Sequence, residues 1–449
     1  MSTPNRASGN DPSAKWPLLL GGLSFALGAV WALVVPPFGA PDEPAHAQAV
    51  AQVRDRLELP TLRIRFDEDP TGVIVWPPPD RAMVEAARRF GQTDPLRLAP
   101  YESFQPPLYY MLGALVSLPV RSDPVATLYV LRLLSVVFGA ATVVACYFAA
   151  RFLAPSEPVW AIAAAGALAL VPQASFNAAT AGNDSLVNFL CALGLASLLK
   201  SLRDPNDDPW LVRAGAIAGA ALLAKQNGLA LVPAIGLTAL FRCLDAPKAD
   251  RFRLFARMTI GATSAFMLVG GWTFGRNLFF YGEPTGVADA AKYFRARFIP
   301  ISIASGSAWG AVIATAWQSF WGRFGWMDKR LPEWAYQGTL VIVVVMLGMT
   351  VARGAALVGR ISKPAWRSMV LMVTVCLATA ALFVWVNFVS HGFQAQGRYF
   401  LPVAVPIMMG LTGGPAWSGK GKRARWTFLY AAGAWLVLLQ AMGLSAARR

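Results

Sequence analysis

Long apolar stretches alternate with short polar segments along most of the chain. The first stretch runs from Trp16 to Val35, about the length that an α-helix needs to cross a bilayer. Ten further stretches follow, so the pattern predicts eleven transmembrane helices. Their approximate ranges are 17–35, 124–150, 159–177, 185–200, 210–224, 228–242, 256–275, 335–358, 368–390, 400–413 and 426–444. Several are short, which is typical of helices that break or end at a cavity.

The segment Pro107–Val120 is also apolar, but it has only 14 residues. If it crossed the membrane, every later loop would change sides. If it does not cross, the most basic short loops all fall in the cytoplasm, as the positive-inside rule requires. Those loops lie around Arg151 and at 200–213, 242–257, 353–367 and 420–425. We therefore predict a re-entrant or surface-lying helix at 107–120 on the outer face, with the N-terminus inside.

This topology divides the chain into four parts. They are a disordered cytoplasmic N-terminus (1–15), a transmembrane module (16–275) that includes a large outer loop (36–123), a second outer loop (276–334), and C-terminal transmembrane helices (335–449). The middle of the second loop, Ser305–Trp321, has the pattern of an amphipathic helix that lies on the membrane surface. Both large loops are predicted on the outer face, so the polar motifs of interest gather on one side.

Composition supports a polytopic membrane protein. Hydrophobic residues make up 56% of the 449 residues and charged residues only 14%, which excludes a soluble domain of this size. The net charge of +16 does not indicate nucleic-acid binding, because the basic residues gather in short loops, where they set orientation. The four cysteines lie in or beside apolar stretches without the spacing of metal ligands.

An acidic pair, Asp42 and Glu43, follows the first transmembrane helix in the stretch PPFGAPDEPAH. Two adjacent carboxylates at a membrane surface raise each other's pKa, so their presence together calls for a structural or functional explanation. One interpretation is a general base or a cation site, and the other is a helix N-terminus, where acidic residues complement the macrodipole. His46 stands three residues after Glu43 and shares its helical face, so it could join a metal site. The sequence specifies no certain cofactor and leaves a divalent cation open.

Three basic residues are predicted at the outer face, where positive charge is otherwise rare. Lys225 lies in LLAKQNGL between two short apolar stretches, where a lysine either faces a cavity or extends its head to the interface. Arg276 and Arg398 stand at the outer ends of predicted helices. Each arginine alone could contact a lipid headgroup, but the three together favour a phosphate-binding site.

The remaining site candidates allow both structural and functional interpretations. Gln105 and Tyr109 lie in YESFQPPLYYML, where the tyrosine could also be an interfacial anchor. Asn183 and Asp184 lie in AGNDSLVNFL, where Asp184 either caps a helix or joins Asp42 at the same membrane face. Tyr399 directly follows Arg398 in QGRYFLP.

Five segments together resemble a bacterial membrane family known as domain of unknown function 2142. They are PPFGAPDEPAH, FQPPLYYML, AGNDSLVNFL, SFWGRFGWMDKRLPEW and QGRYFLP, in this order, and the resemblance covers roughly 30–415. That family is related to the C-type (GT-C) glycosyltransferases, which include protein mannosyltransferases and the aminoarabinose transferases of lipid A. Relatives often have His-Pro-Pro where this chain has Gln105-Pro106-Pro107, which weakens a catalytic role for Gln105.

The resemblance implies an all-α, GT-C-like polytopic fold and an inverting transfer from a polyprenyl-phosphate-linked sugar. The acceptor would be a glycan or a lipid-linked acceptor of the cell envelope, used on the outer face of a bacterial cytoplasmic membrane. Its acidic motif would be catalytic: Asp42 is our first choice for the base that takes the acceptor proton, with Glu43 second. Lys225, Arg276 and Arg398 would stabilise the leaving phosphate.

Two other classes of function fit the sequence less well. A transporter or flippase of an anionic lipid-linked substrate should place its charged site near the membrane midplane, whereas these motifs are predicted at one face. A non-catalytic assembly subunit is the third interpretation. The partners expected from the sequence are therefore the donor lipid, the acceptor and the bilayer, without nucleic acid.

Overall fold

The computed structural model describes residues 15–448 except 67–72, 77–78, 96, 205–208, 288–289, 292–298, 358, 391 and 417–421. The predicted disordered N-terminus therefore lies almost entirely outside the described residues. The helices of the first half are α1 (Trp16–Val34), α2 (Glu43–Arg56), α3 (Arg81–Arg89), α4 (Leu108–Ser117), α5 (Pro124–Leu153), α6 (Pro158–Leu170), α7 (Pro172–Ala178), α8 (Asp184–Arg203) and α9 (Pro209–Ala224).

The second half continues the helical pattern. Its helices are α10 (Val232–Asp245), α11 (Arg251–Phe266), α12 (Trp272–Tyr281), α14 (Gly306–Trp321), α15 (Glu333–Ala356), α16 (Lys363–Trp385), α17 (Ala404–Ala416) and α18 (Lys422–Arg448). Short 3₁₀ or π segments are η2 (Tyr101–Phe104), η3 (Leu118–Val120), η4 (Gln226–Leu231), η5 (Met267–Gly271), η6 (Val386–Ser390) and η7 (Gly397–Val403). Two small antiparallel pairs join β1 (Arg63–Phe66) to β2 (Val73–Trp76) and β3 (Arg323–Phe324) to β4 (Lys329–Arg330).

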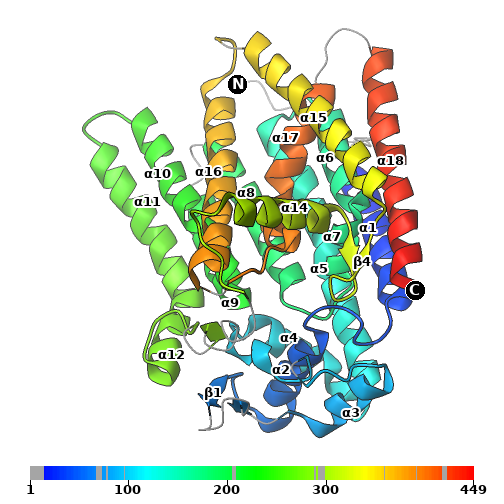
Figure 1. The fold of residues 1–449 in the computed structure, drawn as a ribbon. Helices are drawn as coiled ribbons and strands as arrows, with labels where there is room; N and C mark the ends of the chain where they lie inside the picture. The colour runs from blue at the N-terminus through cyan, green and yellow to red at the C-terminus, as the bar shows by residue number, and fades with distance from the viewer. Residues whose placement is uncertain are drawn as a thin grey trace.

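The long helices form one bundle whose two ends differ (Figure 1). The connections α10–α11 and α15–α16 lie at one end, and α2, α3 and α4 lie at the other. Among the described residues, nine helices or continuous helical runs are long and apolar enough to cross a membrane. The bent pair α6–α7 would be a tenth span, whereas α9, the helix at the predicted span 210–224, has only 16 residues. All eleven predicted helices are present, but not all are full crossings by length.

Two breaks in the helices shape the site end of the bundle. Pro172 supplies no backbone donor, and the chain bends by 65° between α6 and α7 at this point. After α9 ends at Ala224, Lys225 is fully extended (φ −163°, ψ 147°) before η4 begins. The stretch 210–224 is not a full crossing because α9 is short and ends at Ala224. The extended residue that follows the helix is Lys225.

Glycines let α9 approach the next helices closely. A Cβ at Gly215 would lie 2.2 Å from the carbonyl oxygen of Ala262, and one at Gly270 would lie 2.3 Å from that of Gly219. Small residues at such crossings are typical of helix packing in membranes. These glycines hold α9, and with it Lys225, against the helical run from α11 to α12.

Two predicted non-spanning helices are present in the structure. The stretch 107–120 forms α4 and η3, and Figure 1 shows α4 beside α2 and α3 at the end of the bundle. The stretch 305–321 forms α14, which begins where the Ser305 hydroxyl accepts a hydrogen bond from the Ala308 amide (3.3 Å). Helix α14 runs across the long helices in Figure 1.

Candidate functional site

A cavity of about 460 Å³ opens at the end of the bundle that carries α2 and α4. Its wall is built from segments far apart in the sequence, and its charged residues include Asp42, Glu102, Lys225 and Arg398. Side-chain amides and aromatic rings complete much of the wall: Gln105, Gln226, Asn227, Gln394, Gln396, Tyr101, Phe104, Trp326, Phe383, Trp385 and Tyr399. This composition suits a ligand that has both charged and polyhydroxylated parts.

Asp42 directs its carboxylate into this cavity. It precedes α2 in a left-handed backbone conformation (φ 67°), and its side chain makes no capping hydrogen bond in the described structure. One carboxylate oxygen accepts a hydrogen bond from the Tyr101 hydroxyl (2.7 Å), and the other accepts one from Arg398 (2.5 Å). Burial alone would raise the pKa of Asp42, but the positive charge of Arg398, with smaller contributions from His46 and Tyr101, holds it below its ordinary value. The carboxylate is therefore ionised at neutral pH.

Glu43 points away from the cavity and is completely buried. Its two oxygens pair with Arg132 of α5, each at 2.8 Å, and one also accepts a hydrogen bond from the Ala181 amide (3.1 Å). Arg132 in turn donates to the carbonyl oxygens of Ala32 (2.8 Å) and Val35 (2.7 Å). The ion pair therefore joins the end of α1, the start of α2 and the middle of the bundle. The structure separates the predicted acidic pair into one cavity-facing and one buried carboxylate.

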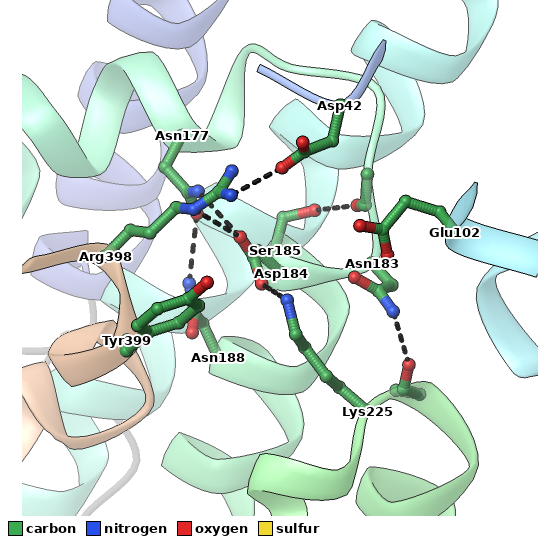
Figure 2. A network of polar contacts seen from close by, with 12 residues as sticks. Asp42, Glu102, Asn177, Asn183, Asp184, Ser185, Asn188, Lys225, Arg398 and Tyr399 are labelled. Atoms are coloured by element: carbon green, nitrogen blue, oxygen red, sulfur yellow. Dashed lines mark hydrogen bonds and ion pairs between the residues drawn. The ribbon is translucent and has the colours of Figure 1, made fainter. Parts of the chain in front are cut away.

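Asp184 binds two cations of the cavity wall, Lys225 and Arg398. Its carboxylate lies 2.5 Å from Lys225 Nζ and 3.7 Å from Arg398 Nε, and Figure 2 shows it between the two basic heads. Asn177 adds a weaker contact to the same carboxylate (3.4 Å) and also accepts a hydrogen bond from Asn188 (3.2 Å). Asp184 is the first residue of α8, but its carboxylate is engaged by these side chains. The cluster thus alternates charge in the order Asp42, Arg398, Asp184, Lys225.

Arg276 lies outside this cluster of charged side chains. It is buried, and it donates hydrogen bonds to the carbonyl oxygen of Pro60 and to Asn277 Oδ1 (3.0 Å). Among the described residues it is not part of the cavity wall. The structure therefore brings two of the three predicted phosphate-binding cations together, Lys225 and Arg398, and places the third against the first outer loop.

The other predicted residues divide between the cavity and its support. Gln105 and Tyr399 line the cavity, and the Tyr399 ring lies 5.8 Å from Lys225 Nζ. Tyr109 is fully buried, with its hydroxyl 3.0 Å from that of Ser135. Asn183 donates to the carbonyl oxygen of Ala224 (3.0 Å), the last residue of α9. Tyr109 and Asn183 are thus packing and capping residues around the site.

His46 is buried in the first part of α2, one helical turn after Asp42. Its Nδ1 is 2.9 Å from the hydroxyl of Tyr110. Burial lowers the pKa of His46 to about 4, although the negative charge of Asp42 opposes this shift. The imidazole is therefore neutral at physiological pH.

Glu102 is a buried, charged cavity residue that the sequence did not single out. It belongs to η2, it is 7% exposed, and its Oε2 has no hydrogen-bond partner among the described residues. Burial raises its pKa to about 7, and the nearby charge of Asp42 adds to the shift. Its position three residues before Gln105, in the same proline-flanked segment, was the one available signal.

Comparison with known proteins agrees with the fold described above. Residues 84–407 match the family model described as predicted membrane protein (DUF2142). No curated protein sequence matches the chain. Among solved structures, ArnT from Cupriavidus metallidurans bound to undecaprenyl phosphate has a TM-score of 0.54 at 14% identity, and the match covers 93% of this chain and 63% of ArnT.

The apo form of ArnT gives the same TM-score of 0.54 at 16% identity, with 94% and 63% coverage. The oligosaccharyltransferase AglB from Archaeoglobus fulgidus, in complex with an inhibitory peptide and a dolichol-phosphate, has a TM-score of 0.54 at 12% identity. That match covers 98% of this chain and 56% of AglB, so the chain spans less than two thirds of the length of either neighbour. The predicted GT-C-like fold is confirmed, and the match over 84–407 shows that the chain belongs to the DUF2142 family of membrane proteins.

Proposed function

We propose that the protein is a membrane glycosyltransferase that moves a sugar from a polyprenyl-phosphate-linked donor to a cell-envelope acceptor on the outer face of the cytoplasmic membrane. One observation carries this proposal: an ionised carboxylate, Asp42, and two cations, Lys225 and Arg398, share one cavity of about 460 Å³. Transfer from a lipid phosphate needs both a proton acceptor and positive charge at the leaving group.

The two cations would bind the donor phosphate by exchanging partners. Both are now paired with carboxylates, Lys225 with Asp184 and Arg398 with Asp42 and Asp184. A phosphate offers the same cations more oxygens and more charge than one carboxylate. When Arg398 turns to the phosphate, Asp42 loses the charge that lowers its pKa and becomes a stronger base. Donor binding would thus activate Asp42.

In the reaction that we propose, the acceptor hydroxyl attacks the anomeric carbon of the donor sugar. The new carbon–oxygen bond forms on the face opposite the phosphate, and the bond between sugar and phosphate breaks. Asp42 takes the hydroxyl proton, and the electron pair of the broken bond stays on the polyprenyl phosphate, where Lys225 and Arg398 stabilise it. A direct displacement of this kind inverts the anomeric centre. Glu43 has no role in it, because its carboxylate is buried against Arg132.

An apolar cavity beside the polar one suits the lipid tail. It has a volume of about 440 Å³ and lies between α14, α16 and η7, with Trp309, Trp317 and Phe400 in its wall. Phe383 lines both cavities, so a ligand could place its phosphate in one and its chain in the other. The solved neighbours agree with this choice of ligand, since ArnT was crystallised with undecaprenyl phosphate and AglB was solved with a dolichol-phosphate. A carrier would instead need its site near the midplane.

Lipid that remains bound during purification tests the proposal. The full chain is extracted in mild detergent and its lipids are identified by mass spectrometry. We expect a polyprenyl phosphate, bare or carrying one sugar, and we expect its loss from an Arg398→Gln variant. If polyprenyl phosphate is no more abundant than in an unrelated membrane protein from the same cells, the proposed donor is wrong.

A further inference from the structure

Three side chains at the cavity wall converge in a way that the proposed transfer does not require. Asp42, His46 and Glu102 each present a potential ligand atom, and these atoms all lie within 4.8 Å of one another. Asp42 and His46 are joined by the first backbone hydrogen bond of α2 (2.9 Å), and Glu102 comes from η2. We propose that they form a binding site for one divalent transition-metal ion, such as Mn²⁺ or Zn²⁺.

Glu102 gives the first independent support. Its side chain is more than nine-tenths buried, and its Oε2 has no partner among the residues that the structure describes. A buried carboxylate oxygen is costly unless it is paired or coordinates a metal. The nearest charged neighbour in the cluster is another carboxylate, Asp42, which adds repulsion. A cation between the two would remove both costs.

His46 gives the second independent support, which depends on which ring nitrogen carries the proton. The Tyr110 hydroxyl donates its single proton to the backbone carbonyl oxygen of Glu102 (3.2 Å), which can only accept. His46 Nδ1 lies 2.9 Å from the same hydroxyl. In the tautomer that carries its proton on Nδ1, the imidazole donates to the Tyr110 hydroxyl and keeps a lone pair on Nε2. Histidines that ligate metals usually donate their other ring N–H to such a partner. Gly182 lies beside the Nε2 edge, and its lack of a side chain leaves room there, because a Cβ at this position would lie 3.2 Å from Nε2.

The donor set indicates the class of ion. Carboxylates alone suit Mg²⁺ and Ca²⁺, whereas an added imidazole shifts the preference toward transition metals. Three protein ligands leave coordination positions open, and Asp42 and Glu102 both line the cavity, so those positions face the substrate space. When bound, such an ion would supply positive charge for a phosphate oxygen.

The ion and the base role of Asp42 are compatible. Asp42 has two oxygens, so one can hold the ion while the other remains available for a proton, and the charge of the ion would lower the basicity of this carboxylate as Arg398 does. The ion would also compete with Arg398 for this carboxylate, which would free the guanidinium for a phosphate. Only this consequence rests on the proposed function; the metal site itself rests on the three side chains.

Direct binding of Mn²⁺ tests the site without donor or acceptor. The full chain is placed in phosphatidylcholine nanodiscs, stripped with EDTA and titrated with Mn²⁺, and free Mn²⁺ is followed by electron paramagnetic resonance. We expect one site in the wild type. We expect affinity to fall by more than about tenfold in Glu102→Gln and in His46→Gln. We expect a fall of about 10–100-fold in Tyr110→Phe, which keeps all three ligands but removes the hydroxyl that contacts His46 Nδ1 and the Glu102 carbonyl oxygen.

The matched control is Glu85→Gln, which removes an exposed carboxylate of α3 that is 69% exposed and paired only with Arg89. It should bind Mn²⁺ as the wild type does. Thermal unfolding shows whether each variant is folded, and Tyr110→Phe serves if Glu102→Gln is not. If the wild type binds Mn²⁺ no better than His46→Gln or Tyr110→Phe, the inference is overturned, and Asp42 and Glu102 share a proton instead. If Mn²⁺ binds in this way but the purified protein carries no polyprenyl phosphate, the proposed donor is wrong and the metal site stands.

Discussion

Two arginine–carboxylate pairs lie close together in this protein and differ in nearly every physical property. The Glu43–Arg132 pair is 0% exposed at both side chains, and its atoms are saturated by backbone groups. The Asp42–Arg398 pair is 17% and 13% exposed, it faces a cavity, and Arg398 Nε has no hydrogen bond among the described residues. A pair with every bond satisfied can only hold elements together, whereas a pair with spare capacity can exchange partners with a ligand. The two carboxylates are sequence neighbours, so side-chain type alone does not separate their roles.

The largest effect is expected from Asp42→Asn. The amide cannot accept a proton, so sugar transfer should fall by about 10²–10⁴-fold, the usual loss when a general base is removed. Asparagine tolerates the left-handed conformation at this position, so the variant should fold and insert normally. Transfer in membranes and thermal unfolding of purified protein measure the two properties. Turnover close to wild type would remove Asp42 from the mechanism and leave the cavity-facing pair as structural as the buried one.

The buried pair should respond in the opposite way. Glu43→Gln leaves the Arg132 charge uncompensated inside the bundle, so the free energy of unfolding should fall by about 3–5 kcal/mol. The lost stability should be partly restored in a Glu43→Met/Arg132→Met double variant, because replacing both members of a buried pair costs less than removing one. Thermal denaturation in detergent measures the effect. A stable Glu43→Gln protein without transfer activity would reverse the roles that we assign to the two carboxylates.

The cavity cations should control lipid binding rather than folding. Lys225→Met and Arg398→Gln each remove a charge-assisted contact, so affinity for undecaprenyl phosphate should fall by about 10–100-fold. Lys225→Met also leaves Asp184 without its closest partner. The double variant Lys225→Met/Asp184→Asn is the control for that unpaired charge, and it should still bind the lipid weakly. Recovery of full affinity in the double variant would mean that Lys225 only neutralises Asp184.

The smallest effect on lipid binding is expected from Arg276→Gln. This side chain is held by the Pro60 carbonyl group, outside the described cavity wall, so undecaprenyl phosphate should bind as it does to the wild type. Stability should fall slightly, because the first outer loop loses a contact with α12. A loss of affinity as large as that of Arg398→Gln would place the phosphate between the cavity and Arg276.

The sequence predicted the fold well because hydrophobic length dominates a membrane protein. Each of the eleven predicted stretches is helical in the structure, although 159–177 is divided into α6 and α7. The stretch 107–120 forms the short helices α4 and η3, and its predicted place at the membrane surface stays a prediction. Lys225 could be predicted to face a cavity because a lysine between two apolar stretches must either face a cavity or extend to the membrane interface. The bend between α6 and α7 and the shortness of α9 depend on tertiary packing, so the count of full crossings did not follow from the pattern.

The site was predicted only in part, for geometric reasons. The side chains of Asp42 and Glu43 point to different surroundings because Asp42 adopts φ 67°, a backbone angle that could not be predicted from the sequence. Arg276 stands at a helix end like Arg398, but no sequence pattern tells which way an end residue points. Glu102 is one of many acids in the first outer loop, and only the folded chain brings it within reach of Asp42.

The backbone of Asp42 has a consequence for how this position can change. A residue other than glycine in the left-handed region carries a conformational cost of order 1 kcal/mol, and asparagine and aspartate bear it best. Selection for stability alone would therefore replace Asp42 with glycine, which would relieve the cost and free Arg398 of its partner. With the base role that we propose for Asp42, an aspartate at this position trades stability for activity. Related proteins that have lost the proposed activity should therefore carry glycine or asparagine at position 42, while Glu43 and Arg132 remain. The residue at position 42 would then distinguish active from inactive proteins of this fold.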